Sequence, residues 1–162
     1  MNKVFLILFL LLSSLDANSY HFKENRYSYA LDKEMHFNGI ITFTPTSMSI
    51  KYEKSHQVIT LTDGEVSITQ KGKSVKLGTV ESLQLARYLE LLLLLYQGNE
   101  ALIETEFSTK VEDETTTLTP KHELSAYLNR IEYTKRREKL RKLTMFLTNQ
   151  DKIKIRILNE VH

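Results

Sequence analysis

The strongest constraint on the fold is a run of five leucines, Leu91–Leu95, inside a segment with helical signals. Thr79 is a suitable N-cap, Glu81 falls in the first turn, and Gly98 stands where helices commonly end in a left-handed residue. Five consecutive leucines point in every direction around a helix axis, so the helix predicted over 81–96 is apolar nearly all round in its second half. Such a helix must be covered on all sides, by protein core or by a ligand.

The segment before this helix alternates apolar and polar residues with the period of two that is typical of half-buried strands. The alternation runs over Met35–Phe43 and resumes over Met48–Tyr52. Asp63-Gly64 and Lys71-Gly72 are turn signals between the short apolar runs that follow. Residues 20–77 are therefore predicted to form an antiparallel meander of short strands.

The segment after the helix is also predicted to be mainly strand. Residues 107–118 fit a hairpin, and Ile153, Ile155 and Ile157 alternate with basic residues as in a half-buried strand. We expect three closing strands, with a helix as the alternative for residues 121–142. The overall prediction is an α+β, mainly β fold in which a curved antiparallel sheet packs around the leucine-rich helix.

The N-terminus has the layout of a secretory signal peptide. Lys3 precedes nine unbroken apolar residues, Val4–Leu12, and a small polar stretch follows. As a helix this run spans about 14 Å, under half of the hydrocarbon core, so a membrane anchor is not expected. We predict a cleaved signal peptide over residues 1–19, a single domain over 20–162, and a periplasmic location. A net charge of +2 gives no reason to expect a nucleic-acid partner.

The sequence carries no signature of catalysis. Cysteine is absent, and the five histidines never fall at metal-ligand spacing. The five glycines form no phosphate loop, and no nucleophile elbow is present. We therefore expect no enzyme, no catalytic residue, no metal and no cofactor.

A basic segment, 135–142, holds six cationic residues in eight positions. In an exported protein such a segment favours anionic lipid headgroups or an acidic partner surface, with a solvated hairpin tip as the plain alternative. An acidic stretch between Glu100 and Glu114 could also neutralise it across neighbouring strands. The candidate docking residues are Lys135, Arg136, Arg137, Lys139, Arg141 and Lys142.

The apolar stripes support two structures for the interior. The sheet and helix can form a filled core without a cavity, or the sheet can half-close around a helical lid and leave room for an acyl chain. Apolar stripes are usually core, so the pattern alone favours the filled form. In the second form, the lining residues would be Phe37, Ile41, Phe43, Met48, Ile50, Tyr52, Leu89, Leu92 and Leu93.

The order of these parts resembles the LolA-like family of periplasmic lipoprotein carriers. Three stretches carry the resemblance in sequence, together with the leucine-rich helix: Gly39–Pro45, Ile59–Gly64 and Leu118–Lys121. The short chain and its Phe22–Arg26 opening are most similar to variants associated with glycolipid or aryl-polyene export clusters. Thr44 stands where the family carries an arginine before the proline.

The resemblance implies an unclosed β-barrel with a helical lid, as in LolA and LolB. It also implies a soluble, monomeric periplasmic carrier of lipid or lipoprotein acyl chains. Such a carrier would load from an inner-membrane exporter complex and deliver to an outer-membrane acceptor. The alternative is a non-enzymatic envelope interaction module with a filled core, which docks through the basic segment 135–142.

Overall fold

A computed structural model describes residues 17–161 of the chain. Most of the expected signal peptide, residues 1–16, lies outside the described residues. The first strand begins at Asn18, two residues before the expected start of the mature chain, and the Ser19 hydroxyl lies 2.8 Å from that of Thr42 on the neighbouring strand.

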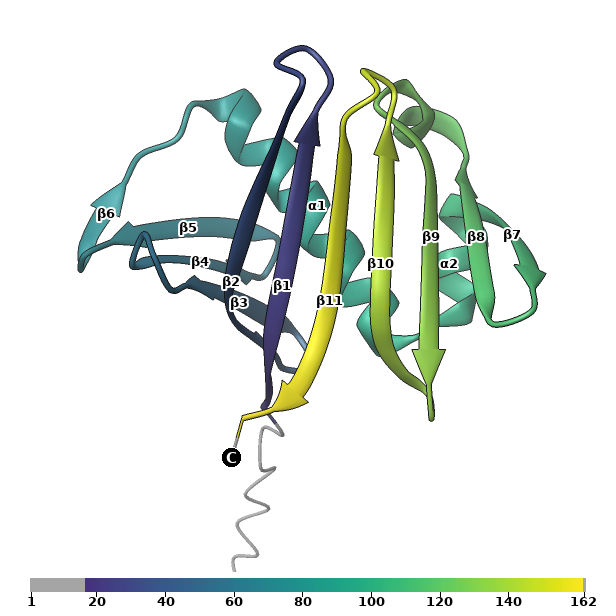
Figure 1. Cartoon of the computed structure of the whole chain (residues 1–162), viewed down its shortest axis with the longest axis horizontal. Coiled ribbons are helices and arrows are strands. Elements are labelled where there is room, and N and C mark those ends of the chain that lie inside the picture. Colours follow the sequence, from purple (N-terminus) through teal and green to yellow (C-terminus); the bar gives the residue numbers. More distant parts are fainter. Residues whose placement is uncertain (1–16, 162) are drawn as a thin grey trace, which may run out of the picture.

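Eleven strands and two α-helices make up the described chain (Figure 1). The first six strands precede the long helix α1, and the other five follow the short helix α2. In chain order the elements are β1 Asn18–Ser28, β2 Lys33–Phe43, β3 Ser47–Tyr52, β4 Gln57–Thr62, β5 Glu65–Gln70, β6 Lys73–Val75, α1 Thr79–Gln97, α2 Glu100–Glu106, β7 Phe107–Glu112, β8 Thr115–Pro120, the 3₁₀ helix η1 His122–Ala126, β9 Leu128–Arg136, β10 Lys139–Leu147 and β11 Lys152–Glu160.

All eleven strands form one antiparallel sheet in the order β6-β5-β4-β3-β2-β1-β11-β10-β9-β8-β7. Strand β1 pairs with both β2 and β11, so the first and last strands of the chain lie side by side at the centre of the sheet. Within the described residues the edge strands β6 and β7 do not pair with each other, so the barrel is not closed. The predicted fold class, a mainly β, curved antiparallel sheet with a helical lid, is confirmed.

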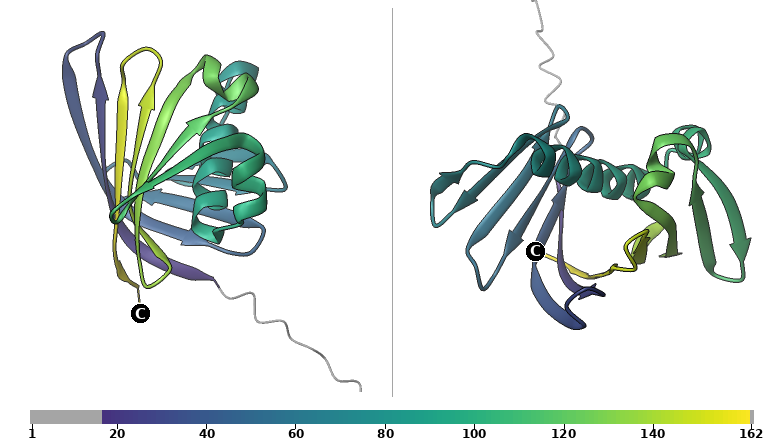
Figure 2. Two further views of the ribbon diagram at one scale, coloured as in Figure 1. Left: turned by 90° about the vertical axis from the view of Figure 1, so that its right-hand side faces the viewer. Right: turned by 90° about the horizontal axis from the view of Figure 1, so that it is seen from above.

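Both helices lie on the concave side of the sheet (Figure 2). Seen from above, α1 runs across the opening between the β3–β6 limb and the limb that carries β7 and β8. Its buried residues, Ala86, Leu89, Leu92 and Leu95, join the inward-facing strand residues in one hydrophobic core. The helix therefore covers the sheet as a lid.

Most of the predicted elements are confirmed, and two details are corrected. The three closing strands are present as β9, β10 and β11, and the helical alternative for 121–142 reduces to the single turn η1. The N-cap of α1 is Gly78, without a side-chain capping bond, and not Thr79. Gly98 ends the helix in the left-handed conformation, as expected, with φ 67°.

Gly39 lies at a close approach between the backbones of β2 and β3. It pairs with Phe22 on one side and with Tyr52 on the other, and the rings of these two residues meet edge to face at 5.7 Å across it. A Cβ at Gly39 would stand 1.9 Å from the backbone carbonyl oxygen of Lys51. Only glycine fits here, because the obstructing atom belongs to the backbone of the neighbouring strand.

Gly39→Ala is expected to lower the free energy of unfolding by about 3 kcal/mol, because the two strands must separate to admit the methyl group. Urea unfolding followed by circular dichroism measures the loss. Gly72→Ala is the matched control, since Gly72 has φ 77° in open space and the substitution adds only backbone strain of about 1 kcal/mol. Equal losses in both variants would contradict the steric explanation.

Candidate functional site

The concave face of the sheet presents a continuous apolar wall to α1. Strands β2 and β3 supply most of it, because their inward-facing residues alternate with polar ones on the convex side. The structure brings all nine predicted lining residues into the same hydrophobic cluster. Phe37 and Leu93 are partly buried. The other seven are buried: Ile41, Phe43, Met48, Ile50, Tyr52, Leu89 and Leu92.

Helix α1 makes polar side-chain contacts with the sheet only at its C-terminal end, among the described residues. Gln97 Nε2 donates to the carbonyl of Pro45 at 2.6 Å, and the hydroxyls of Tyr96 and Tyr20 lie 3.4 Å apart. The Tyr96 ring also stacks on Phe43, with centroids 3.8 Å apart. Tyr88 and the leucines nearer the N-terminus pack by apolar contact alone. The helix is thus anchored at one end.

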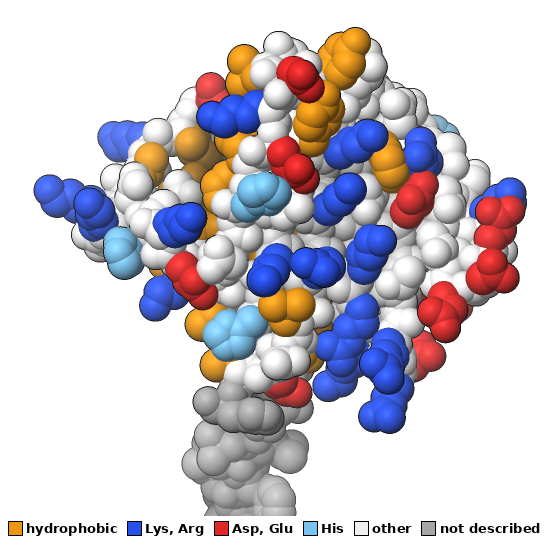
Figure 3. Space-filling view, viewed as in Figure 1, with side chains coloured by type: hydrophobic (Ala, Val, Ile, Leu, Met, Phe, Trp, Pro, Cys, Tyr) orange, Lys and Arg blue, Asp and Glu red, His pale blue; other side chains and the backbone are white. Residues whose placement is uncertain are grey.

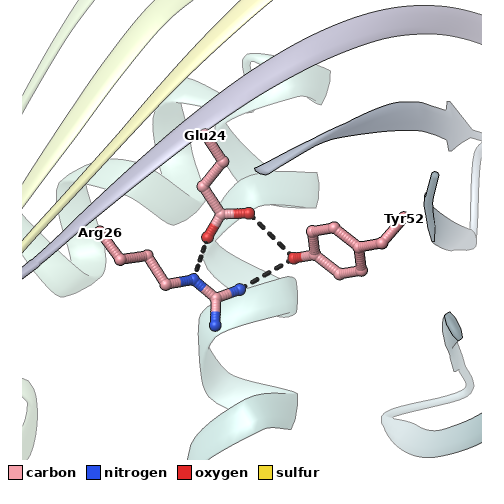
Figure 4. A network of polar contacts seen from close by, with 3 residues as sticks. All are labelled: Glu24, Arg26 and Tyr52. Atoms are coloured by element: carbon pink, nitrogen blue, oxygen red, sulfur yellow. Dashed lines mark hydrogen bonds and ion pairs between the residues drawn. The ribbon is translucent and has the colours of Figure 1, made fainter. Parts of the chain in front are cut away.

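A polar cluster lies within this apolar surface (Figure 4). Glu24 on β1 is completely buried and forms an ion pair with Arg26 Nε, two residues further along the same face. Tyr52 on β3 donates its hydroxyl to the other Glu24 oxygen at 2.9 Å and accepts from Arg26 Nη2 at 2.8 Å. Three residues from two strands therefore close a ring of charge-assisted hydrogen bonds.

Aromatic rings hold the arginine of this cluster in place. The Arg26 guanidinium lies 4.9 Å from the centroid of Phe37 and 5.9 Å from that of Tyr52. Burial by itself would lower the pKa of Arg26, but the neighbouring Glu24 carboxylate outweighs it and raises that pKa above its ordinary value. The Arg26 guanidinium of this cluster therefore stays charged.

Tyr88 brings the helix to the same cluster. Its hydroxyl is buried without a hydrogen-bond partner among the described residues. Burial raises the pKa of Tyr88, and the charge of Glu24 raises it further. A buried hydroxyl without a partner costs about 1–3 kcal/mol.

Glu24, Arg26 and Tyr88 are not among the predicted site residues. One sequence signal could have found the first two. They continue the alternation of Tyr20 and Phe22, and so fall on the apolar face of β1. A charged pair on the apolar face of a strand is rarely buried without a specific role.

The predicted docking residues differ in their contacts. Lys135 Nζ lies beside the end of α1, 3.0 Å from where a Cβ on Gly98 would stand. Lys139 pairs with Glu160 at 3.7 Å, and Arg141 donates to the carbonyl of Leu158 at 2.9 Å. The other three are exposed: Arg136, Arg137 and Lys142.

The acidic stretch does not neutralise the basic segment. Figure 3 shows the acidic side chains gathered at the edge where β7 and β8 lie, and basic side chains at the lower end, where β9 turns into β10. None of the ion pairs between described residues joins the two groups. The basic hairpin tip remains open to a partner.

Two surface pockets lie away from the predicted lining residues. One is on the exposed part of β1, β2 and β11 around Tyr27 and Lys152, and the other is at the opposite end of β1, around Lys139 and Arg141. Across residues 17–161 no group of three histidine or acidic side chains is placed to hold a metal ion. Neither helix in this range is long and apolar enough to cross a membrane.

The buried tyrosines predict a loss of stability in alkali. Burial raises the pKa of Tyr96 to about 12, with a contribution from its hydrogen bond to Tyr20, and burial also raises that of Tyr52. Above about pH 10 the unfolded chain therefore loses these protons before the folded chain does, and the free energy of unfolding falls as pH rises from 10 towards 12. Urea unfolding between pH 8 and pH 12 should show this decline, and Tyr96→Phe should make it shallower. If the free energy of unfolding of Tyr96→Phe falls with pH as steeply as that of the unmodified chain, Tyr96 does not contribute to the decline.

The fold and the site together define an unclosed antiparallel barrel whose apolar interior is covered by a helical lid and contains one buried ion pair. No protein-family model and no curated protein matches the sequence. Among solved structures, the chain is similar to a LolA superfamily protein from Nitrosomonas europaea at 7% identity and a TM-score of 0.42. The match covers 90% of this chain and 86% of that one.

Proposed function

We propose that this protein is a non-enzymatic, monomeric carrier of the LolA-like type that shields an acyl chain between its curved sheet and helix α1. The observation that carries the proposal is the lid itself. Helix α1 packs into the concave apolar face with Leu89, Leu92 and Leu95, yet it also keeps apolar residues on its outer side, where Val80 is 66% exposed and Leu83 is 63% exposed. A helix that only completed a core would need no apolar outer side.

The contacts of the lid support a motion that opens it. Its C-terminal end is anchored by Gln97 and Tyr96, whereas its N-terminal half is held by apolar contacts, which an acyl chain can replace. We propose that the N-terminal half moves away from β3–β5 as the chain enters. The exposed Val80 and Leu83 would then face the membrane from which the lipid is taken.

The energy of burial is sufficient for such a carrier. About ten methylene groups, at about 0.8 kcal/mol each, contribute roughly 8 kcal/mol before ordering costs, which corresponds to micromolar binding. A shuttle has to release its cargo, so moderate affinity suits a carrier. We propose a lipid or lipoprotein cargo, loaded at an inner-membrane exporter complex and delivered to an outer-membrane acceptor from the periplasm.

Titration with cis-parinaric acid, a fluorescent fatty acid, tests this function. The full sequence is expressed in a bacterium, and the purified product is delipidated before the titration. We expect saturable binding of one acyl chain per protein molecule at micromolar concentration, displaced by unlabelled lipid. A signal that does not saturate would contradict the carrier.

The exposed hairpin tip favours a second function, docking to an acidic envelope surface. Arg136 and Arg137 lie at the turn between β9 and β10 and take part in none of the ion pairs between described residues. Changing both to glutamate should abolish binding to vesicles that contain phosphatidylglycerol and leave parinaric acid binding intact. If the double variant keeps both its vesicle binding and its parinaric acid binding, docking through this tip is rejected.

A further inference from the structure

Two neighbouring strands are irregular at the same end of the sheet. In β10 the pairing with β9 moves from Leu140 directly to Lys142, so Arg141 is an extra residue. In β11 the pairing with β1 shifts between Ile157 and Glu160. Such bulges are frequent beside functional sites, where they redirect side chains.

These irregularities surround a pocket of about 600 Å³. Its walls come from Tyr20 and His21 on β1, Lys139 and Arg141 on β10, and the segment 158–160 on β11. Lys139 Nζ lies 3.7 Å from the Glu160 carboxylate and 6.0 Å from the centre of the Tyr20 ring. The pocket is thus lined by two basic side chains and one acidic side chain.

Only some of the hydrogen-bond donors of Arg141 have an acceptor in this pocket. Its Nη1 donates to the carbonyl of Leu158 at 2.9 Å, which fixes the guanidinium against β11. Its Nε is buried and has no hydrogen-bond partner among the described residues. A charged donor buried without an acceptor is costly, and a guanidinium edge suits the oxygens of a phosphate. Because Nε is closed to solvent, a ligand oxygen would reach it only if the side chains that cover it move aside.

The pocket adjoins the apolar interior through aromatic residues. Tyr20 belongs both to the pocket wall and to the buried core, and its hydroxyl lies 3.4 Å from that of Tyr96 on α1. Tyr96 in turn stacks on Phe43 inside the sheet. An amphiphile could therefore place its polar end beside Arg141 and its acyl chain beneath the lid.

We infer that this pocket binds a phosphate group, and, resting on the proposed carrier function, that this phosphate is the headgroup of the carried lipid. Arg141 donates to the phosphate from Nε, and Lys139 turns from Glu160 to pair with it. A guanidinium and an ammonium group, two positions apart on one bulged strand, together neutralise a phosphodiester.

The test compares two short-chain lipids that differ only in the headgroup, dihexanoyl phosphatidylglycerol and dihexanoylglycerol, by calorimetry. Arg141→Gln and Lys139→Gln should each weaken binding of the phosphatidylglycerol about tenfold and leave that of the neutral lipid within twofold. Arg156→Gln, the same charge change at an exposed residue of the neighbouring strand β11, is the matched control and should alter neither. Circular dichroism confirms that each variant is folded.

The inference would be overturned if both variants, Arg141→Gln and Lys139→Gln, bound phosphatidylglycerol as tightly as the unmodified chain does. It would also be overturned if the substitutions weakened the binding of both lipids to the same extent. Titration with inorganic phosphate, followed by NMR of the labelled protein, separates the two proposals. One outcome is that phosphate changes the chemical shifts of pocket residues in the unmodified chain but not in Arg141→Gln, while neither lipid binds. That result would support the phosphate site and reject the carrier. Absence of both phosphate and lipid binding would reject both.

Discussion

Replacing Arg26 with methionine is expected to lower the free energy of unfolding by about 3 kcal/mol or more, because it leaves a charge buried without its partner. Glu24 has no exposed surface, and without Arg26 its carboxylate keeps only the Tyr52 hydroxyl as a donor in this cluster. Urea unfolding at pH 7 measures the loss. Glu24→Gln combined with Arg26→Met should recover most of it, since neither member of the pair is then charged.

The matched control for this prediction is Arg87→Met on α1. Arg87 forms an ion pair with Glu90 at 3.3 Å, but the two side chains are 63% and 40% exposed. An exposed pair of this kind contributes less than about 1 kcal/mol. A similar small change in both variants would show that the Glu24–Arg26 pair does not stabilise the fold.

A charge placed under the lid is expected to abolish lipid uptake. Leu92 is 1% exposed and faces the sheet, so Leu92→Glu introduces a carboxylate where the acyl chain is proposed to lie. Parinaric acid binding should fall at least tenfold. Gln84→Glu, which adds the same carboxylate at an exposed position of the same helix, is the control and should bind as the unmodified chain does.

A second variant keeps this prediction independent of a folding defect. Leu92→Trp adds apolar volume at the same position without a charge, at an expected cost of about 1–3 kcal/mol in stability. It should also weaken uptake, because the larger side chain occupies the proposed path of the acyl chain. Undiminished uptake by folded variants of both kinds would exclude Leu92 from the binding region.

The sheet could be predicted largely from local patterns. Alternation located β2 and β3, and Asp63-Gly64 located the turn between β4 and β5, where both residues have positive φ. The helix ends at Gly98, as its left-handed conformation requires. These features depend on residues close in sequence, which is why the sequence alone specifies them.

The polar cluster could not be predicted in the same way, because it depends on contacts across the sheet. Glu24 and Arg26 meet Tyr52 only because β1, β2 and β3 are neighbours and Gly39 lets the sheet bend between them. The extra residue at Arg141 in β10 likewise depends on the pairing with β9 and leaves no signal in the local pattern.

A native mass spectrum tests the carrier most directly. The full sequence is expressed in a bacterium, and the protein is purified without detergent and without delipidation. We predict added mass that disappears on denaturation and is recovered as lipid on extraction. The same measurement on Leu92→Glu should show the protein mass alone, and on Gln84→Glu the added mass should persist. A clean protein mass for the unmodified chain, after purification and again after incubation with lipid vesicles, would contradict the account and favour a filled core that docks through Arg136 and Arg137.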